Sequence, residues 1–301
     1  MSVLLTGATG FIGQAVLTAL VAAGYRVTAL VDDQDDADQV RAAGADPFLA
    51  SEEDTRTISE LALESDGVIH TATSRADDAD FIAAVTPGLL TSDKPFVYTS
   101  SLWTYGSGLD LTEESPAAPP AAVAWMDETA RRLLADDSEG MRVVVVAPGI
   151  VYGHGQGIPR RFVDDLDRSG QEPVLPSIGD GSQHWATVHV DDLADLYVRI
   201  IGAESHQNDV YIAASEADET VAELAAAAAS AAGATVRAES AEETAERLGA
   251  ALAGVLLLDQ HARADRARGR LGWRTTRPAL RDELRAGYLD VPGDPLLGSP
   301  A

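Results

Sequence analysis

The sequence predicts an α/β fold in which a doubly wound parallel sheet carries a smaller C-terminal substrate lobe. Short apolar runs alternate with helical periodicity over the first half of the chain, and this alternation loosens after Pro148. Strands separated by helical crossovers form a parallel sheet that is covered on both faces. We therefore expect a ligand-binding domain over residues 1–150 and a lobe formed mainly by residues 151–301, part of which returns to the sheet.

The elements follow from the spacing of apolar residues and from glycine and proline breaks. Strands are expected at Val3–Thr6, Arg26–Val31, Pro47–Leu49, Gly67–Ala72, Phe96–Ser100 and Met141–Ala147. Helices are expected between them at Phe11–Ala23, Asp38–Ala43, Thr57–Glu64, Phe81–Val85 and Ala124–Leu134. Later helices are expected at Pro159–Arg168, Asp191–Gly202, Thr220–Ala232, Ala241–Leu258 and Ala279–Gly287, before a loose tail over Asp290–Ala301.

Composition excludes several classes of function. The chain has 301 residues, 46% of them apolar, and 22 basic against 48 acidic residues give a net charge of −26. Such a charge repels nucleic acid and anionic lipid surfaces, so neither is an expected partner. The absence of cysteine excludes disulfides, thiolate nucleophiles and cysteine-bound metals. No apolar run is long enough to span a membrane and no signal peptide is visible, so we expect a cytoplasmic protein.

The basic residues are 21 arginines and one lysine, Lys94. An acidic, lysine-poor surface is typical of a salt-rich cytoplasm, where hydrated carboxylates keep a protein in solution and salt screens their repulsion. A GC-rich genome also favours arginine, alanine, glycine and aspartate codons. Both the halophilic and the codon-usage explanations remain open.

A glycine-rich turn, Gly7-Ala8-Thr9-Gly10-Phe11-Ile12-Gly13, joins the first strand to the first helix. Its three glycines allow a tight turn, a close approach to a pyrophosphate and close packing of helix on strand. Asp32 stands 19 residues after Gly13, at the end of the second strand, where a carboxylate holds the ribose hydroxyls of NAD and repels the 2′-phosphate of NADP. A solvated acidic loop is the alternative, because residues 32–38 contain five aspartates.

Motifs along nearly the whole chain resemble the short-chain dehydrogenase/reductase superfamily, in particular its extended or atypical NAD-dependent epimerase/dehydratase branch. The similar segments, in order, are TGATGFIG (6–13), VIHTA (68–72), VYTSSLWTYG (97–106), PGIVYG (148–153), VHVDDLADLY (188–197) and LGW (271–273). The resemblance implies a Rossmann fold and NAD bound by Gly7, Thr9, Gly10, Phe11, Ile12, Gly13, Asp32, Thr71, Ala72, Pro148 and Val151. Two positions depart from the family pattern: Ser51 replaces a common aspartate and Ala147 a common arginine.

The catalytic pair of that superfamily is missing. Its members use a Tyr-x-x-x-Lys pair in which lysine lowers the pKa of the tyrosine, so that the phenol exchanges a proton with the substrate. None of the seven tyrosines is followed four residues later by lysine. At family spacing the two positions hold Trp125 and Thr129, and neither side chain can replace the pair chemically.

Three residues are candidates for catalysis. Ser101 matches the family serine and is expected to hold a substrate oxygen, unless it only caps the strand end. Tyr105 can serve as a displaced proton donor with a pKa near the ordinary value of about 10, or can simply pack. His154 lies beside the nicotinamide loop implied by the resemblance, where it is either a proton donor or a surface histidine.

We expect no metal site. His184 and His189 lie five residues apart, which places them on opposite faces of a strand, and no carboxylate completes a ligand set with them. Trp185 and the turn Gly179-Asp180-Gly181 either close over the substrate or belong to the core.

Two functions follow from these observations. The first is an NAD-dependent oxidoreductase or epimerase that acts on a hydroxyl or carbonyl of a sugar-like or other small polar metabolite, through Ser101 with Tyr105 or His154. The second is a non-catalytic NAD-binding sensor or scaffold. The partner is a small molecule in both, and a homodimer is compatible with the sequence.

The charge of −26 generates a prediction about salt. If the protein is halophilic, its melting temperature rises steeply from dilute buffer to molar KCl. The reason is that carboxylate repulsion is only partly screened at 0.1 M salt, where the Debye length is about 10 Å. Thermal unfolding followed by circular dichroism over this range measures the effect, and a flat profile supports codon usage as the explanation.

Overall fold

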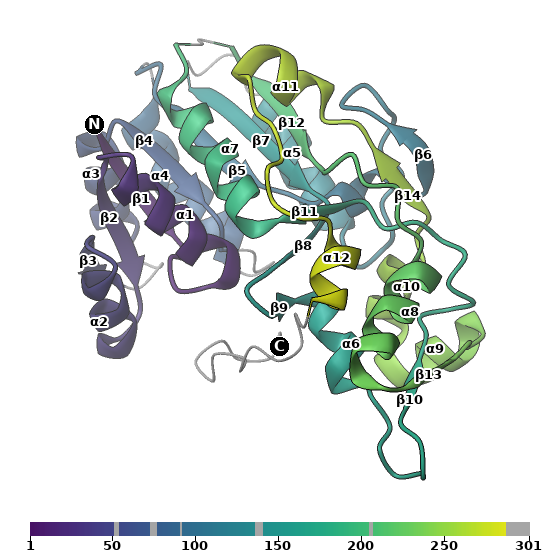
Figure 1. The fold of residues 1–301 in the computed structure, drawn as a ribbon. Coiled ribbons are helices and arrows are strands. Elements are labelled where there is room, and N and C mark those ends of the chain that lie inside the picture. Colours follow the sequence, from purple (N-terminus) through teal and green to yellow (C-terminus); the bar gives the residue numbers. More distant parts are fainter. Residues whose placement is uncertain (51–53, 73–76, 91, 136–140, 205–206, 287–301) are drawn as a thin grey trace.

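The computed structural model describes residues 1–50, 54–72, 77–90, 92–135, 141–204 and 207–286. Its central feature is a seven-stranded sheet in the order β3-β2-β1-β4-β5-β7-β12, in which every pairing is parallel (Figure 1). The strands are β1 (Ser2–Thr6), β2 (Arg26–Val31), β3 (Asp46–Leu49), β4 (Gly67–His70), β5 (Pro95–Thr99), β7 (Arg142–Pro148) and β12 (Asp209–Ala213). The predicted doubly wound parallel fold is therefore confirmed.

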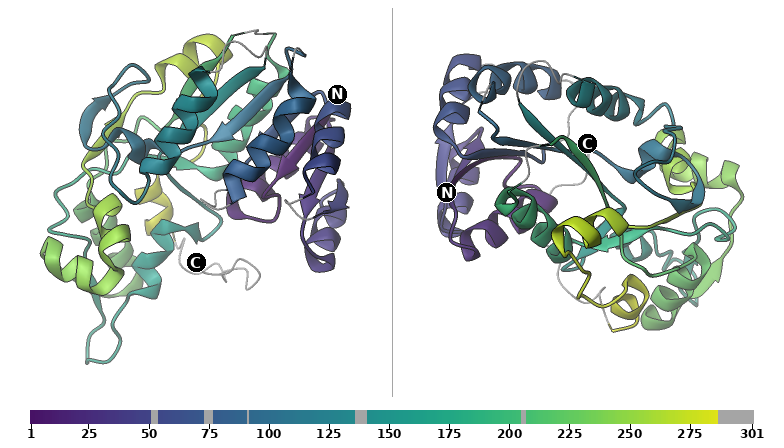
Figure 2. Two further views of the ribbon diagram at one scale, coloured as in Figure 1. Left: turned by 180° about the vertical axis from the view of Figure 1, so that it is seen from behind. Right: turned by 90° about the horizontal axis from the view of Figure 1, so that it is seen from above.

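Alternate residues of the central strands pack into different layers. Val3 and Leu5 of β1 belong to one apolar cluster, whereas Leu4 belongs to another on the opposite face. The first cluster contains α1 (Phe11–Ala22), α2 (Gln34–Ala42) and α7 (Val190–Gly202). The second contains α3 (Thr55–Glu64), α4 (Asp77–Leu89) and α5 (Ala124–Ala135), so the sheet is covered on both faces (Figure 2).

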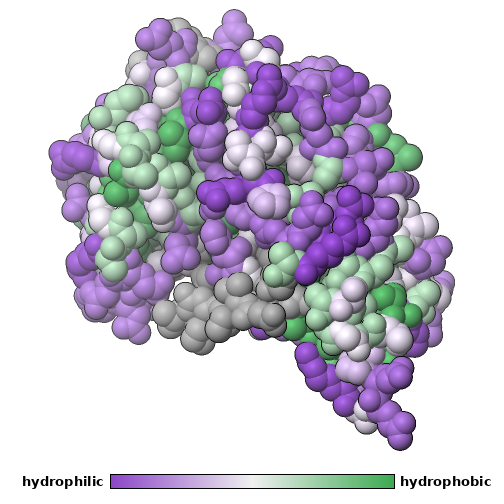
Figure 3. Space-filling model, in the orientation of Figure 1, coloured by the Kyte–Doolittle hydropathy of each residue, from purple (hydrophilic) through white to green (hydrophobic). Residues whose placement is uncertain are grey.

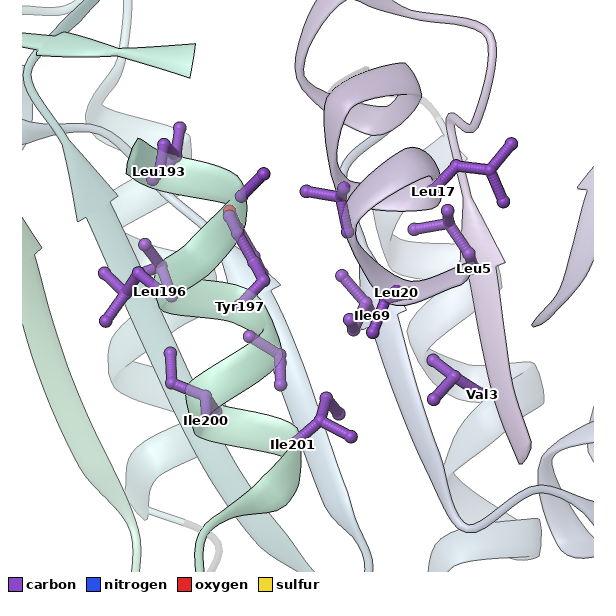
Figure 4. Packing of buried hydrophobic residues seen from close by; sticks show 14 of the residues in the cluster. Val3, Leu5, Leu17, Leu20, Ile69, Leu193, Leu196, Tyr197, Ile200 and Ile201 are labelled. Atoms are coloured by element: carbon purple, nitrogen blue, oxygen red, sulfur yellow. The ribbon is translucent and has the colours of Figure 1, made fainter. Parts of the chain in front are cut away.

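Helices α1 and α7 lie side by side on the same face of the sheet (Figure 4). Leu17 and Leu20 of α1 and Leu196 and Ile200 of α7 are almost fully buried in their shared cluster. Because strands run toward the carboxyl edge of the sheet and these helices run back from it, both helix N-termini lie at that edge. This is the edge at which doubly wound folds bind their ligands.

The rest of the second half forms a smaller lobe around its own apolar cluster. Its elements are β8 (Ile150–Gly153), β9 (Gln156–Gly157), η3 (Ile158–Arg160), α6 (Arg161–Asp164), β10 (Val174–Pro176), β11 (Thr187–His189), α8 (Val221–Ala232), β13 (Thr235–Arg237), α9 (Ala241–Leu248), α10 (Ala250–Leu256) and α12 (Leu280–Arg285). Three further elements connect it to the sheet: η1 (Leu102–Tyr105), β6 (Gly108–Leu111) and β14 (Gln260–Ala262), followed by α11 (Asp265–Leu271). Figure 3 shows hydrophilic residues spread over one face, with hydrophobic residues gathered over α1 and the helices of this lobe.

Four predicted helices differ from the structure by more than two residues. The helices expected over Asp38–Ala43 and Phe81–Val85 begin four residues earlier, as α2 (Gln34–Ala42) and α4 (Asp77–Leu89). The helix expected over Pro159–Arg168 is only η3 and α6 and ends at Asp164. The helix expected over Ala241–Leu258 is divided into α9 and α10 at Gly249, whose φ of +83° interrupts the right-handed helix. The short strands β6, β8 to β11, β13 and β14 were not predicted, because two to four residues carry too little periodicity. The bounds of β12 were not predicted either, although part of the second half was expected to return to the sheet. Ser51 and the expected tail Asp290–Ala301 lie outside the described residues.

The segment after α11 is fastened to the first turns of α7. The Trp273 indole is 1% exposed and donates to the Asp192 carbonyl oxygen at 2.7 Å. The buried Asp192 carboxylate accepts the backbone N–H of Thr276 at 3.0 Å, its hydroxyl at 2.8 Å and the N–H of Arg277 at 3.1 Å. Asp192 therefore holds the chain that leads into α12.

Replacing Asp192 by alanine leaves several donors without an acceptor, so we expect Asp192→Ala to lower the free energy of unfolding by about 3 kcal/mol. Urea denaturation measures this loss. Asp195 lies one turn later but makes an exposed pair with Arg199, so the control Asp195→Ala is expected to cost less than about 1 kcal/mol. Equal losses in both variants contradict the assigned role of Asp192.

Candidate functional site

The turn between β1 and α1 leaves the N-terminus of the helix open to a ligand. Gly7 has a φ of +67°, and a Cβ atom at Gly13 would lie 1.9 Å from the Gly7 carbonyl oxygen. The N-cap is Gly10, so no side chain caps α1, and the first turn contains no acidic residue. Uncapped N–H groups and the positive end of the helix dipole suit a pyrophosphate, so the turn fits the cofactor expected from the sequence.

The chain after β4 supports this turn. The Thr71 hydroxyl donates to the Thr6 carbonyl oxygen at 2.7 Å. A Cβ atom at Gly7 would lie 2.6 Å from the backbone nitrogen of Ala72. The positions assigned to the cofactor on the two neighbouring strands, Gly7 and Thr71 to Ala72, are therefore in direct contact.

The acidic segment after β2 separates into residues with different roles. Asp33 caps α2, because its side chain accepts the backbone N–H of Asp36 at 2.9 Å. Burial raises the pKa of Asp36 although a hydrogen bond from Thr9 opposes the rise, and Asp33, Asp32 and Asp35 add repulsion. Asp32 is exposed and makes no hydrogen bond to the described residues. Of the two adjacent aspartates, Asp33 serves as the cap, and the cofactor-binding role of Asp32 stays a prediction.

Ser101 follows β5 at the carboxyl edge of the sheet and begins η1. Its Oγ accepts the backbone N–H of Trp103 at 3.2 Å, so the capping role considered from the sequence is present. That bond uses a lone pair and leaves the hydroxyl hydrogen free to donate. Capping and substrate binding are therefore compatible at Ser101.

Tyr105 lies at the other end of η1 and packs against an apolar cluster that includes Leu111 and Ile212. Burial, reinforced by the nearby carboxylate of Glu113, raises its pKa to about 12. The expectation of a pKa near 10 is therefore wrong, because the sequence could not reveal this burial. A phenol with this pKa stays protonated at neutral pH and does not act there as a base.

His154 is held by α7. Its Nε2 lies 2.9 Å from Asp191 Oδ1, and the backbone has a φ of +54° between two glycines. The side chain lines a groove of about 520 Å³ between α1 and α7, together with Phe11, Gln14, Val190, Asp191 and Arg277. In this arrangement His154 fastens the turn after β8 to the first turn of α7.

The structure brings together a group of possible metal ligands that sequence spacing did not reveal: His154, His189 and Asp191, whose ligand atoms lie within 4.8 Å of one another. Their polar atoms are already engaged. Asp191 Oδ2 lies 2.9 Å from Arg277, while His189 Nδ1 accepts the backbone N–H of Asp191 at 3.1 Å. We assign these residues to a hydrogen-bonded network.

His184 lies elsewhere. Its Nδ1 lies 2.8 Å from Asp259 Oδ1, and it precedes the strand β11 that ends at His189. Trp185 is 2% exposed, packs beside Phe162 and donates to the Leu256 carbonyl oxygen at 3.0 Å. Trp185 is therefore a core residue, the second of the two alternatives for it.

The loop after β7 is packed tightly. Pro148 ends β7, and a Cβ atom at Gly149 would lie 2.3 Å from the Ala186 carbonyl oxygen. Val151, in β8, is partly buried against the cluster under α1. Gly157 approaches both Val151 and the Phe11 ring. A Cβ atom at Gly157 would lie 2.3 Å from the Val151 carbonyl oxygen and 3.1 Å from Phe11 Cε1. This loop thus reaches the N-terminus of α1.

The two residues expected from family spacing at the positions of the catalytic pair lie on α5. Trp125, in the first turn, is partly exposed, and Thr129 one turn later is 8% exposed. Helix α5 contacts η1, which carries Ser101 at its N-cap. Lys94 is partly exposed and donates to the Leu63 carbonyl oxygen at 2.6 Å, so it does not replace the lysine of the pair.

A parallel sheet with an uncapped glycine turn at its carboxyl edge defines a dinucleotide-binding α/β protein. Residues 3–214 match the NAD dependent epimerase/dehydratase family, and the chain belongs to this family. The resemblance seen in the sequence is confirmed, and so is NAD as the family's cofactor.

Two relatives and one solved structure illustrate the similarity. An uncharacterized protein of Schizosaccharomyces pombe is 30% identical, and the match covers 94% of this chain and 98% of the relative. A 4-hydroxy-2-methyl-3-oxo-4-farnesyl-3,4-dihydroquinoline-1-oxide ketoreductase of Stigmatella aurantiaca is 31% identical over 51% of each chain. The structure of MoeE5 in complex with UDP-glucuronic acid and NAD has a TM-score of 0.76 at 19% identity, covering 96% of this chain and 98% of that one, which shows a shared fold.

None of the helices in the described ranges is long and apolar enough to cross a membrane.

The acidic segment generates a prediction about cofactor choice. NAD is expected to raise the melting temperature more than NADP at equal concentration, because Asp32, Asp33, Asp35 and Asp36 repel a 2′-phosphate. Thermal unfolding with each nucleotide measures the difference. Asp32→Arg is expected to reverse the order, whereas Asp38→Arg, further along α2, serves as a control of equal charge change. A larger shift with NADP for the unmodified protein overturns the prediction.

Proposed function

We propose that this protein is an NAD-dependent oxidoreductase or epimerase that acts on a hydroxyl or carbonyl group of a small metabolite. The observation that carries the proposal is the position of Ser101, with a hydroxyl hydrogen free to donate, at the carboxyl edge that also holds the uncapped N-terminus of α1. A ketoreductase among the relatives supports it. The sugar-like or polar character of the substrate, which was expected from the sequence, stays a prediction.

Each site residue then has a definite task. When bound, NAD would accept a hydride from the substrate, and its reduced form NADH would supply one. Gly7, Gly10 and Gly13 let the backbone approach its pyrophosphate, and Asp32 accepts hydrogen bonds from the ribose. Ser101 orients the substrate oxygen by donating its hydroxyl hydrogen.

Tyr105 is the proton donor that we assign. Its phenol is protonated at neutral pH, as that of an ordinary tyrosine is, so it can give a proton to a carbonyl oxygen during reduction, although a pKa raised to about 12 makes it a weaker acid. The reverse direction, in which the phenolate must accept a proton, is disfavoured for the same reason. His154, through Asp191, positions the turn beside Phe11.

A second function is favoured by one observation. Trp125 and Thr129 occupy the positions of the catalytic pair in α5, and neither can transfer a proton. A protein with this helix and an intact glycine turn can bind NAD as a sensor or scaffold without turning over a substrate.

Three variants test the assigned roles. Since general acid catalysis contributes about 10²- to 10⁴-fold, Ser101→Ala and Tyr105→Phe are each expected to lower kcat by at least about 10²-fold and to leave NAD affinity unchanged. His154→Ala is expected to lower kcat less. The control Tyr25→Phe, at a residue that follows the C-terminal end of α1, is expected to leave kcat unchanged. Steady-state kinetics with NADH and a carbonyl substrate measures this. Full turnover in both Ser101→Ala and Tyr105→Phe contradicts the assignment.

The pH profile tests Tyr105 separately. An acid with a pKa of about 12 does not titrate between about pH 6 and 10, so the reduction rate in that range is expected to show no loss due to a tyrosine. If no substrate is turned over at any pH while NAD still binds, the second function holds. The decisive test is then the double variant Trp125→Tyr with Thr129→Lys, which introduces the tyrosine and lysine of the catalytic pair and is expected to gain activity.

A further inference from the structure

Four partly exposed apolar side chains lie on η1, whose N-cap is Ser101, on the contacting helix α5, and on η3. Trp103 in η1, Trp125 and Met126 in the first turn of α5, and Ile158 at the start of η3 are all partly exposed. We call these four residues the apolar shelf. Trp103, Met126 and Ile158 pack against the cluster of the small lobe, so one side of each is fixed and the other is left accessible.

Hydrogen bonds of the backbone and contacts between helices connect the apolar shelf to Ser101. The Trp103 N–H binds Ser101 Oγ at 3.2 Å, and η1 contacts α5. The Met126 N–H donates to the Val123 carbonyl oxygen at 3.0 Å, which fixes the beginning of α5 beside the small lobe. The two tryptophans therefore lie on elements that touch each other next to the serine hydroxyl.

The charges around the apolar shelf do not suit an anionic substrate. Arg160 and Arg161 lie two and three residues after Ile158, but Arg160 pairs with Asp164 at 3.2 Å and Arg161 with Asp165 at 3.6 Å. The carboxylate of Asp165 also binds Arg247, which in turn binds Glu239. Within the described part of the small lobe, these cations are already neutralised, and the whole chain carries a charge of −26. A diphosphate would have to displace such pairs against that field.

We infer that the substrate presents an apolar, planar skeleton to the apolar shelf, with its carbonyl or hydroxyl group at Ser101, in place of a sugar attached to a diphosphate. Tryptophan faces bind planar apolar groups by stacking and by removal of apolar surface from water. This inference rests on the proposed function, since it names the substrate class of the same site. It departs from the sugar-like or polar metabolite expected from the sequence, and the experiment below distinguishes the two substrate classes.

The test uses two neutral probes of known structure, 1-tetralone and its alcohol 1-tetralol, with UDP-glucose as the anionic comparison. In the presence of saturating NAD or NADH, 1-tetralone is expected to raise the melting temperature and to quench tryptophan fluorescence, whereas UDP-glucose at equal concentration does neither. A shift with UDP-glucose and none with 1-tetralone overturns the inference and leaves the proposed function standing.

Variants then locate the binding. Trp125→Ala is expected to weaken 1-tetralone binding about 3- to 10-fold, and Met126→Glu at least about 10-fold, while the stabilisation by NAD stays unchanged. Leu109→Ala removes an exposed apolar side chain of β6 outside the apolar shelf and is expected to have no effect. If Trp125→Ala or Met126→Glu fails to fold, Trp125→Gln is measured in its place. Unchanged 1-tetralone affinity in both Trp125 variants overturns the inference.

Turnover separates the two proposals. Oxidation of 1-tetralol with NAD, or reduction of 1-tetralone with NADH, supports both. Binding of 1-tetralone that depends on the apolar shelf, without turnover in either direction, supports the ligand class and counts against the catalytic function.

Discussion

The contact between the glycine turn and the first helix is the constraint on which the rest of the structure depends. With 1.9 Å between a Cβ at Gly13 and the Gly7 carbonyl oxygen, only glycine lets α1 begin directly against β1. That position presents the uncapped end of α1 at the carboxyl edge of the sheet and gives α7 a partner to pack against. Residues in the first turn of α7 then bind His154, Arg277 and the segment that leads to α12.

Much of this could be predicted from the sequence because the central strands are continuous apolar runs buried on both faces. The bounds of β2 were predicted without error, and those of β1 to within one residue. The glycine turn was identified by its residue types and place. At Asp32 and Asp33 the sequence could not assign the cap, since that depends on where α2 begins, and the structure places its first residue at Gln34.

The remainder could not be predicted because it depends on contacts between distant residues. His154 and Asp191 are 37 positions apart, and no local pattern connects them. The raised pKa of Tyr105 has the same origin, because Ile212 and Leu111 help to exclude water from it. Trp185 lies in the core whereas Trp125 is partly exposed. This difference in burial likewise follows from packing and not from residue type.

The pairing of β6 with β14 has a consequence for how the chain folds. The N–H of Asp259, just before β14, binds the Ser107 hydroxyl across a separation of 152 residues, and β14 then pairs in parallel with β6. Such non-local pairings close large loops and form late. During synthesis β6 therefore has no partner strand until about half of the chain has followed it, and β7 likewise lacks β12 as its neighbour. Exposed strand edges in this interval make the nascent protein dependent on protection from aggregation until its last third has been made.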